Sequence, residues 1–517
     1  MARDERFGTE PPGPGWTYKG ELRWIRGDVA MTDNPKVPER GPRLAIVGGG
    51  PAGLFTAYLL NKLFPAAEVT LFEATDFLGG KLHTDRFDDG TLFEAGVAEL
   101  YEYLGPGGRD ALRQLIEEDL GLPTVNMKGG AVILDEKLVR TVDEVEGAFA
   151  RATAENIRKF HDRVAELMPL AKYARRWQPD NSHPWADKTF HECIRQEIPD
   201  DPVAVCYIET AVHTDLATEP HTCNGLNGIK NVLMDNDKYM QLYHIRGGLD
   251  RIVCELKLKI DAYYRLHAVV TRIVSSGHSF TLHYVHGTEK EQEEFEAVIV
   301  AIPNHWLSQI RFDNPSLAQA IHTVIAHYDL PAHYLRVSLL FDEPFWDKHR
   351  IPGDFWMMDL YNGCCVYNES YRWVSTRGHV LSFLIPGQDA LLQASENQDT
   401  VEIVERLVNR LPDLLRDDAR RHLRDAQIDS YLGSVNAQPG GWPAEELRQE
   451  HYPDPQNNPG FFLVGDYFFD STLNACLISA HTAVEYVLDY FDAPEPKREG
   501  FLKNLYSAGK SLSLTAS

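Results

Sequence analysis

The stretch from Arg43 to Glu73 constrains the fold more than any other part of the chain. Branched apolar residues at 44–47 lead into a glycine-rich turn at 48–53. Apolar residues at helical spacing continue to Leu63, and a second apolar run covers 69–72. This order predicts a β-strand, a tight turn, an α-helix and a second strand, which is the unit from which open α/β sheets are built.

The glycines of this turn have separate physical tasks. Gly48 lets the chain turn sharply off the strand, Gly50 leaves room for a pyrophosphate on the helix N-terminus, and Gly53 lets helix and strand pack closely. Glu73 lies twenty residues after Gly53, where a carboxylate can accept hydrogen bonds from both hydroxyls of an adenosine ribose. Glycine-rich turns alone are common, but the flanking strand, helix and acid are all present. The stretch therefore predicts a dinucleotide-binding unit.

Length and composition predict a globular chain with room for two or three domains. The chain has 517 residues, of which 43% are hydrophobic, and its formal net charge is −25. Nucleic acid and anionic membrane surfaces would be repelled by that charge. The N-terminus lacks the apolar core of a signal peptide, and no stretch is apolar enough to span a bilayer. We expect a soluble cytoplasmic protein that acts on a small molecule, with no nucleic-acid partner.

The seven cysteines predict neither a disulfide framework nor a metal site. They are odd in number and show no Cys-x-x-Cys or other metal-ligand spacing, so we interpret them as reduced thiols. Cys364 and Cys365 are adjacent and could close only a strained disulfide, so they are expected to be core thiols. No metal is predicted.

The remaining chain predicts further strands and helices. Gly79, Gly80 and Lys81 follow the nucleotide unit as a second glycine turn, whose N–H groups and cation could reach phosphate. The region from 105 to about 241 has a helical pattern. Helices are expected at 157–175, 203–217, 244–258, 400–415 and 473–490. Strands are expected at 268–274, 280–285, 297–302, 331–341, 380–384 and 461–464.

In this order, the pieces resemble the flavin-containing amine oxidase superfamily, which includes amino-acid oxidases, polyamine oxidases, protoporphyrinogen oxidases and phytoene desaturases. The glycine turn with Glu73 resembles the FAD-binding unit of that superfamily, and Lys81 stands where its second glycine motif usually has arginine. LHAVVTRI resembles a segment in which a backbone valine, here Val270, meets adenine. VIVAIPNHWL resembles the strand that returns to the substrate domain, and FFLVGDYF resembles a terminal motif whose acid, here Asp466, binds FAD.

The resemblance covers nearly all of residues 43–492 and implies an α/β fold in which a discontinuous Rossmann-like FAD-binding domain is interleaved with a mixed-sheet and helical substrate domain. The FAD-binding domain would comprise 43–104, 244–310 and 440–492. The substrate domain would comprise 105–243 and 311–439, with an N-terminal extension at 1–42 and a tail at 493–517. The implied FAD contacts are Gly48, Gly50, Pro51, Ala52, Gly53, Glu73, Ala74, Gly80, Lys81, Leu82, Val270, Gly465, Asp466 and Leu473.

Arg336 departs from the pattern that the resemblance implies. It lies eight residues before Pro344, where amine oxidases place a lysine that holds a water against flavin N5. An arginine is planar, stays charged and cannot act as a base, so it suits a carboxylate, a phosphate or a reduced-flavin anion better than proton transfer. We predict a catalytic role for Arg336, with a structural salt bridge as the alternative.

Glu99 and Trp442 complete the predicted catalytic set. Glu99 stands close to where amino-acid oxidases of the superfamily carry an arginine for the substrate carboxylate, and a glutamate there favours a cationic amine. A structural acid is the alternative. Trp442 falls where monoamine oxidases have the aromatic residue that follows their flavin-linked cysteine, and it could instead be a core residue. Gly441 replaces that cysteine, so the resemblance implies that FAD is bound without a covalent link.

The leading prediction is an FAD-dependent oxidoreductase that oxidises a C–N bond of a small amine or amino acid, with O2 as the acceptor. A desaturase or isomerase acting on a lipophilic substrate is one alternative, because the lysine is replaced. A flavin N-oxygenase is a second, and a flavin-binding scaffold without catalysis is a third. The sequence leaves the substrate, the electron acceptor and a homodimer open.

Overall fold

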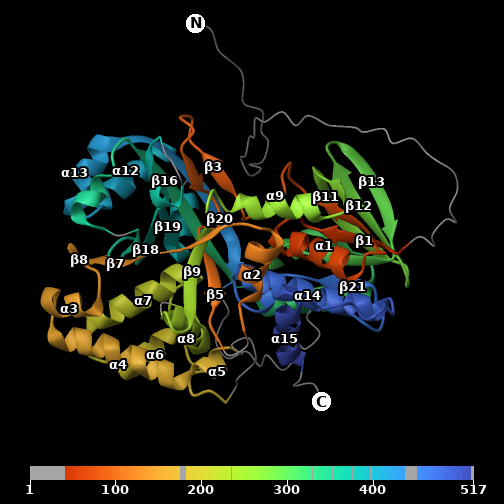
Figure 1. The fold of residues 1–517 in the computed structure, drawn as a ribbon, viewed down its shortest axis with the longest axis horizontal. Helices are drawn as coiled ribbons and strands as arrows, with labels where there is room; N and C mark the ends of the chain where they lie inside the picture. The colour runs from red at the N-terminus through yellow and green to blue at the C-terminus, as the bar shows by residue number, and fades with distance from the viewer. Residues whose placement is uncertain are drawn as a thin grey trace, which may run out of the picture. The chain divides into compact units, whose positions relative to one another are not determined.

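The glycine-rich unit forms part of a parallel five-stranded sheet (Figure 1). Each strand pairs with its neighbours in parallel. Strands from three distant parts of the chain therefore build one sheet, which is the discontinuous α/β arrangement that we expected. In order across the sheet, the strands are β10 (Tyr263–Arg265), β2 (Glu68–Phe72), β1 (Arg43–Val47), β14 (Ala297–Val300) and β21 (Phe461–Leu463).

Not every residue of the chain is described by this computed structural model. The described residues are 41–105, 108–127, 129–174, 182–234, 236–328, 330–351, 353–373, 377–395, 399–436 and 451–513. Residues 41–517 form one compact unit. The boundaries predicted between an FAD-binding and a substrate domain stay a prediction.

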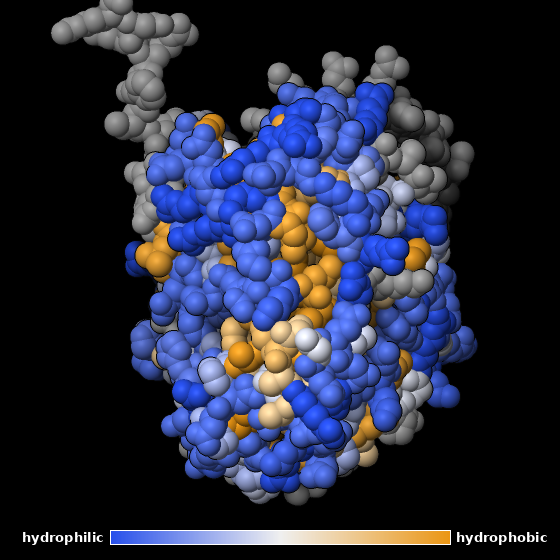
Figure 2. Space-filling model, turned by 90° about the vertical axis from the view of Figure 1, so that its left-hand side faces the viewer, coloured by the Kyte–Doolittle hydropathy of each residue, from blue (hydrophilic) through white to orange (hydrophobic). Residues whose placement is uncertain are grey.

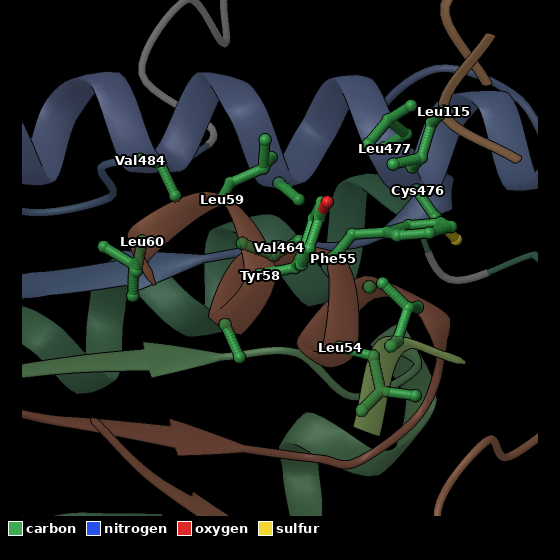
Figure 3. Packing of buried hydrophobic residues seen from close by; sticks show 14 of the residues in the cluster. Leu54, Phe55, Tyr58, Leu59, Leu60, Leu115, Val464, Cys476, Leu477 and Val484 are labelled. Carbon is green, nitrogen blue, oxygen red and sulfur yellow. The ribbon is translucent and has the colours of Figure 1, made fainter. Parts of the chain in front are cut away.

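Two buried helices cover the core beside the five-stranded sheet. α1 (Pro51–Leu63) connects β1 to β2, and α14 (Leu473–Tyr490) follows β21. Side chains of the two helices meet in one apolar cluster, in which Leu59 of α1 lies near Leu477 and Val484 of α14 (Figure 3). Both helices begin after the carboxyl ends of parallel strands, so their N-termini face the same edge of the sheet, where ligands bind in open α/β sheets.

A seven-stranded mixed sheet forms the second large layer. β17 and β7 pair in parallel, whereas its other pairs are antiparallel. In order, its strands are β20 (Leu423–Asn436), β16 (Pro331–Phe341), β19 (His379–Pro386), β18 (Cys364–Asn368), β17 (Asp354–Met357), β7 (Gly129–Leu134) and β8 (Lys137–Val139).

One face of the seven-stranded sheet is apolar. Leu335, Val337 and Leu339 project from β16 into a core with residues of the helices that follow β19, including Ile403 and Leu407. Because side chains alternate along a strand, the residues between them project from the opposite face. The helices in this part of the chain are α11 (Gly387–Ser395), α12 (Thr400–Arg410) and α13 (Asp413–His422).

A helical layer packs below this sheet, in the region where the sequence pattern was helical. Val132 and Leu134 of β7 share its apolar core with Ile157, Phe160 and Val164. The helices are α3 (Val142–Ala148), α4 (Arg151–Leu167), α5 (Leu170–Tyr173), α6 (Phe190–Glu197), α7 (Pro202–Leu216) and α8 (Gly225–Met234).

Smaller sheets and helices complete the fold. β13 is a highly charged strand that pairs with one neighbour only, and charge is a common protection for an exposed sheet edge. The remaining strands are β3 (Thr84–Arg86), β4 (Leu92–Glu94), β5 (Leu100–Tyr103), β6 (Thr124–Asn126), β9 (Met240–Ile245), β11 (Ala268–Ser275), β12 (Phe280–His286), β13 (Glu289–Phe295) and β15 (Arg311–Phe312). The remaining α-helices are α2 (Ala111–Gln114), α9 (Asp250–Lys259), α10 (Pro315–Tyr328) and α15 (Phe501–Ser513).

Several predicted boundaries were wrong. The helix expected at 157–175 ends at Leu167, and the helix expected at 400–415 ends at Arg410, because Pro169 and Pro412 interrupt the two patterns. The predicted helix at 244–258 begins only at Asp250, after the strand β9. The region from 105 to 241 also contains the strands β6, β7 and β8, which the helical interpretation missed.

The surface at the left of Figure 1 is mostly polar. A strip of apolar residues crosses it between polar rims (Figure 2). Within the described ranges, no helix combines the length and apolarity needed to cross a membrane.

Candidate active site

The glycines of the first turn differ in the space around them and in backbone conformation. Gly48 has a φ of +111°, which L-residues rarely adopt. A Cβ on Gly53 would lie 1.9 Å from the Gly48 carbonyl oxygen, so Gly53 is needed for packing. A Cβ on Gly50 would meet no heavy atom within 4 Å. The space beside Gly50 is therefore open to a ligand.

The N-terminus of α1 suits an anion. Gly50 is its N-cap and supplies no side-chain acceptor, and the first turn carries no acidic residue. Helix geometry leaves the N–H groups of Ala52 and Gly53 without an intrahelical acceptor, and Pro51 has no N–H to satisfy. The second glycine turn lies against the first, because a Cβ on Gly80 would be 3.2 Å from the Gly50 Cα atom. These backbone groups fit a pyrophosphate.

Glu73 is oriented beside this turn. Its Oε2 accepts a hydrogen bond of 2.8 Å from the Gly49 N–H, and its Oε1 accepts from the Thr75 N–H and hydroxyl, each at 2.8 Å. The Ala268 N–H donates to the Glu73 carbonyl at 2.9 Å. The structure thus brings Glu73 and Ala74 to the start of β11, which also carries Val270, as an adenosine site requires.

Asp466, the second predicted acid, lies on the opposite side of the glycine corner, which is the name we give to the two adjacent turns at 48–53 and 79–80. Nζ of Lys81 is 3.4 Å from Oδ2 of Asp466, and Leu82 beside it is buried. Gly465 allows close packing, since a Cβ there would lie 2.0 Å from the Tyr467 ring. α14 begins nearby at Leu473, and its first turn also lacks acidic residues. The predicted cofactor residues therefore converge on one edge of the five-stranded sheet.

The face of the seven-stranded sheet opposite its apolar core carries polar side chains. Arg336 on β16 pairs across the strands with Leu384 of β19 and Asp429 of β20. Ser338, two residues along β16, contacts Ser382 through hydroxyls 2.9 Å apart. Arg336, Ser338, Ser382 and Asp429 are all buried. A buried polar face is costly unless its groups are paired, so we interpret this face as the candidate site of function.

The chain that leaves the glycine corner is bound to this polar face. Nη1 of Arg336 donates a 2.9 Å hydrogen bond to the carbonyl of Glu94, and the Tyr431 hydroxyl donates to the carbonyl of Ala95 at 2.9 Å. Nη1 of Arg372, in a 3₁₀ turn at Glu369–Arg372, donates to the carbonyl of Ala98. Side chains of three separate elements therefore hold residues 94–98.

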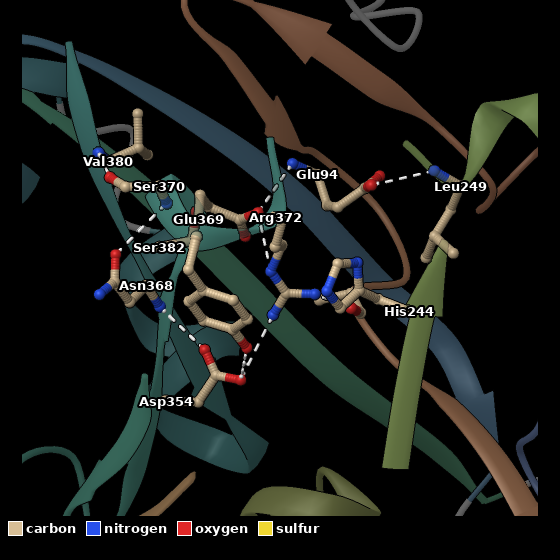
Figure 4. A network of polar contacts seen from close by, with 12 residues as sticks. Glu94, His244, Leu249, Asp354, Asn368, Glu369, Ser370, Arg372, Val380 and Ser382 are labelled. Carbon is tan, nitrogen blue, oxygen red and sulfur yellow. Dashed lines mark hydrogen bonds and ion pairs between the residues drawn. The ribbon is translucent and has the colours of Figure 1, made fainter. Parts of the chain in front are cut away.

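A buried charge network lies beneath this segment (Figure 4). Glu369, which is fully buried, is 3.5 Å from Nη1 of Arg336 and 3.2 Å from Nε of Arg372. Arg372 also lies 3.5 Å from Asp354. Burial raises the pKa of Asp354 to about 6, and burial together with the charge of Glu369 raises the pKa of Glu94 to about 8. At neutral pH, Glu94 is therefore mostly protonated.

Glu99 lies at the end of the held segment, immediately before β5. The Tyr101 hydroxyl donates to its Oε1 at 2.8 Å. Burial raises the pKa of Glu99, whereas the Tyr101 hydrogen bond and the positive charges of Arg372 and Arg336 lower it. The residue as a whole is only partly buried, and burial is the largest influence on the pKa of its carboxyl group.

The structure thus brings two of the three predicted catalytic residues together. The positive charge of Arg336 lowers the pKa of Glu99. Trp442 and Gly441 lie outside the described residues. Sequence reasoning missed Glu369 and Arg372. An acid three residues before an arginine is the pattern of an ordinary surface ion pair, so nothing in the sequence marked the two as buried.

Two further observations concern the cysteines and the possible metal ligands. Cys364 and Cys365 are free and buried, as expected of core thiols. Among the described residues, no group of histidines, cysteines and carboxylates is arranged to hold a metal ion.

This fold and site define a flavin-dependent oxidoreductase, and comparison with known proteins identifies the family. The family described as "Flavin containing amine oxidoreductase" matches residues 51–488. The chain belongs to this family and is an FAD-dependent oxidoreductase.

Named relatives act on several amines. The chain is 24% identical to polyamine oxidase 4 of Oryza sativa subsp. japonica over 436 residues, which cover 78% of this chain and 80% of that protein. It is 24% identical over 338 residues to the flavin-dependent L-tryptophan oxidase RebO of Lentzea aerocolonigenes, covering 60% of this chain and 68% of that protein. Among solved structures, cyclohexylamine oxidase from Brevibacterium oxydans IH-35A superposes with a TM-score of 0.65 at 17% identity, covering 87% of this chain and all (100%) of that chain.

Proposed function

We propose that the protein oxidises a C–N bond of a small amine at the polar face of the seven-stranded sheet. The observation that carries this proposal is the carboxylate of the partly buried residue Glu99, which accepts a hydrogen bond from the Tyr101 hydroxyl and is influenced by the positive charge of Arg336. An acceptor of this kind suits the ammonium group of an amine substrate. The relatives that act on polyamine, cyclohexylamine and tryptophan agree with an amine substrate.

The residues at the glycine corner fit a non-covalently bound FAD. The open space at Gly50 and the acid-free N-terminus of α1 suit the pyrophosphate, assisted by Lys81. Glu73 would accept the ribose hydroxyls beside the start of β11, and Asp466 would bind the ribityl chain. The N-terminus of α14 at Leu473 would face the isoalloxazine ring. FAD, when bound, supplies the two-electron acceptor for the substrate.

The protein's own groups orient the substrate and set the local charge. Glu99 binds the ammonium group and thereby fixes which carbon faces the cofactor. Arg336 contributes a fixed positive charge, because Glu369 and the Glu94 carbonyl hold its guanidinium in one place. A fixed cation favours negative charge that develops during oxidation. Arg336 does not take a proton, so the amine must arrive at the cofactor in its neutral form by losing its proton to Glu99 or to water.

We further propose O2 as the acceptor of the electrons and the cytoplasm as the location. A homodimer is left open. Nucleic acid has no place in the proposed function, because the net charge of −25 repels it.

A peroxide screen tests the proposal. Purified holoenzyme is mixed in air with primary, secondary and diamine substrates and with amino acids, and hydrogen peroxide is measured. We expect release with at least one amine, and a KM that rises about tenfold or more in Glu99→Gln, since a charged hydrogen bond is lost. If no amine releases peroxide or bleaches the flavin anaerobically, while a polyene or another lipophile does bleach it, the protein is a desaturase or isomerase instead.

A further inference from the structure

A buried arginine lies directly behind Glu99. Nη1 of Arg372 donates to the carbonyl of Ala98, the residue immediately before Glu99 in the chain. The Arg372 side chain is 1% exposed and forms ion pairs with Glu369 at 3.2 Å and with Asp354 at 3.5 Å. The guanidinium therefore links the substrate-site segment to two carboxylates of the seven-stranded sheet region.

Aromatic rings hold this guanidinium from other directions. It lies over the ring of Tyr367 at 5.2 Å and over the ring of Tyr371 at 5.5 Å. The Tyr371 hydroxyl donates to Asp354 at 2.6 Å. His244 contacts the Tyr371 ring, and burial and the charge of Arg372 lower the pKa of His244 to about 4. His244 is thus neutral at physiological pH and does not compete for the carboxylates.

Arg372 also dominates the positive charge at Glu99. Among the described charged groups that lower the pKa of Glu99, Arg372 has the larger effect and Arg336 the smaller. The opposite charge of Arg372 favours the ionised carboxylate, whereas burial favours the neutral acid and has the larger effect, so the pKa of Glu99 is raised overall. The titratable groups that act on Glu99 from the surrounding elements are Tyr101, Tyr334, Arg336, Asp354, Cys365, Tyr367 and Arg372, and Asp215 acts on Tyr101 and Tyr334.

We infer that Arg372, held by Glu369 and Asp354, is the positioning residue for Glu99: it fixes the backbone before Glu99 and supplies a positive charge that favours the ionised carboxylate as the partner of an ammonium ligand. The inference rests on the proposed function, which gives Glu99 its ligand. It predicts that the buried pairs at Arg372 control substrate affinity without contacting the substrate.

Two variants separate the two effects of Arg372. Arg372→Met with Glu369→Gln removes one positive and one negative charge together, so the net charge of the buried network stays the same. Arg372→Lys keeps the charge but loses the planar fork that reaches a carbonyl and two carboxylates at once. Arg377→Met is the matched control, because Nη1 of Arg377 also donates to a backbone carbonyl, that of Asp89, but Arg377 is exposed.

The first readout needs no substrate. The carboxylic-acid carbonyl band of Glu99 in the infrared spectrum of the holoenzyme is assigned by its loss in Glu99→Gln, and its disappearance is followed as pH rises. We expect this titration to move up by about one pH unit in Arg372→Met/Glu369→Gln. It should stay in place in Arg372→Lys and in Arg377→Met.

The second readout is ligand affinity. tert-Butylammonium carries no hydrogen on the carbon next to nitrogen, so it binds as a cation without being oxidised. Its Kd, measured by calorimetry, should rise roughly tenfold in Arg372→Lys and in the double variant, and should not change in Arg377→Met. A rise in Kd in Arg372→Lys, with the infrared titration unmoved, would show that Arg372 orients Glu99 and also supplies charge, and that these are distinct effects of one residue.

The outcomes separate this inference from the proposed function. An unmoved infrared titration in the folded double variant overturns the inference, as does an unchanged Kd in Arg372→Lys. Should the double variant fail to fold, the Kd of Arg372→Lys decides alone. If the unmodified protein does not bind tert-butylammonium, the proposed function fails, and the infrared titration still decides whether Arg372 sets the charge of Glu99.

Discussion

The two large sheets of this protein contribute to its site in different ways. The five-stranded sheet offers backbone groups at its edge, and the decisive atoms lie within the short stretch 48–53 and in Glu73. The seven-stranded sheet offers side chains from its face, and its groups come from positions as distant as Glu94, Arg336 and Glu369. In our proposal, a cofactor common to many proteins is thus bound by a local motif, whereas the substrate meets an assembly of distant residues.

The largest predicted effect on stability comes from substitution of Arg336. Arg336→Met should lower the free energy of unfolding by about 3–5 kcal/mol, because it removes a fully buried partner of Glu369. Arg336→Lys keeps the charge and should retain FAD, but turnover or flavin reoxidation should change. Chemical denaturation, flavin absorbance and steady-state kinetics measure these effects. Unchanged stability in Arg336→Met and unchanged kinetics in Arg336→Lys would show that neither the ion pair nor the guanidinium matters.

The next largest effects come from two glycines of the turn at 48–53. Substitution of Gly53 should change stability, whereas substitution of Gly50 should change FAD affinity. Gly53→Ala should lower the free energy of unfolding by about 3 kcal/mol, since its Cβ would lie 1.9 Å from a carbonyl oxygen. Gly50→Ala meets no protein atom within 4 Å, so the apo-protein should keep its stability. Its FAD affinity should fall roughly hundredfold through lost charged hydrogen bonds to phosphate. Thermal unfolding of the apo-proteins and flavin titration measure the two. Full flavin occupancy in Gly50→Ala would show that the pyrophosphate does not bind at this turn.

The difference between the sheets also explains what the sequence could predict. The helix at 473–490 was confirmed at both ends, and the strand, turn and helix of residues 44–63 were confirmed to within a few residues, because their signals are local. The polar face was only partly predictable. Arg336 was found through its spacing from Pro344, but Arg372 and Asp354 become neighbours only when the sheet pairs, and no spacing in the chain encodes that pairing.

The predicted secondary structure was wrong in places for physical reasons, some of which are local and some of which are not. Pro169 and Pro412 each split a helix whose apolar pattern continues across the proline. β13 was missed because its charged residues follow no apolar alternation, and it is held by pairing with β12. The strands within 105–241 belong to sheets whose other members lie far away in the chain.

The smallest predicted effect concerns pH and the buried Glu94. Its pKa rises from an ordinary value of 4.5 to about 8 in the folded protein, through burial and the charge of Glu369. Between these values the folded state keeps a proton that the unfolded chain has lost, so Glu94 makes the fold less stable as pH rises. Glu94→Gln has no proton to lose at this position, so its stability does not fall for this reason as pH rises.

The Tm of the unmodified protein should therefore fall relative to that of Glu94→Gln between pH 5 and pH 8.5, by roughly 2–4 °C. Scanning calorimetry at several pH values measures the difference. Parallel Tm curves for the unmodified protein and Glu94→Gln would contradict a protonated Glu94 in the network.

The crystal structure of the holoenzyme tests most directly whether the two sheets share one flavin. Our account predicts that the pyrophosphate lies beside Gly50 at the N-terminus of α1, and that the isoalloxazine ring faces the polar face of the seven-stranded sheet that carries Arg336. Electron density that places the ring away from the polar face of the seven-stranded sheet would contradict the account.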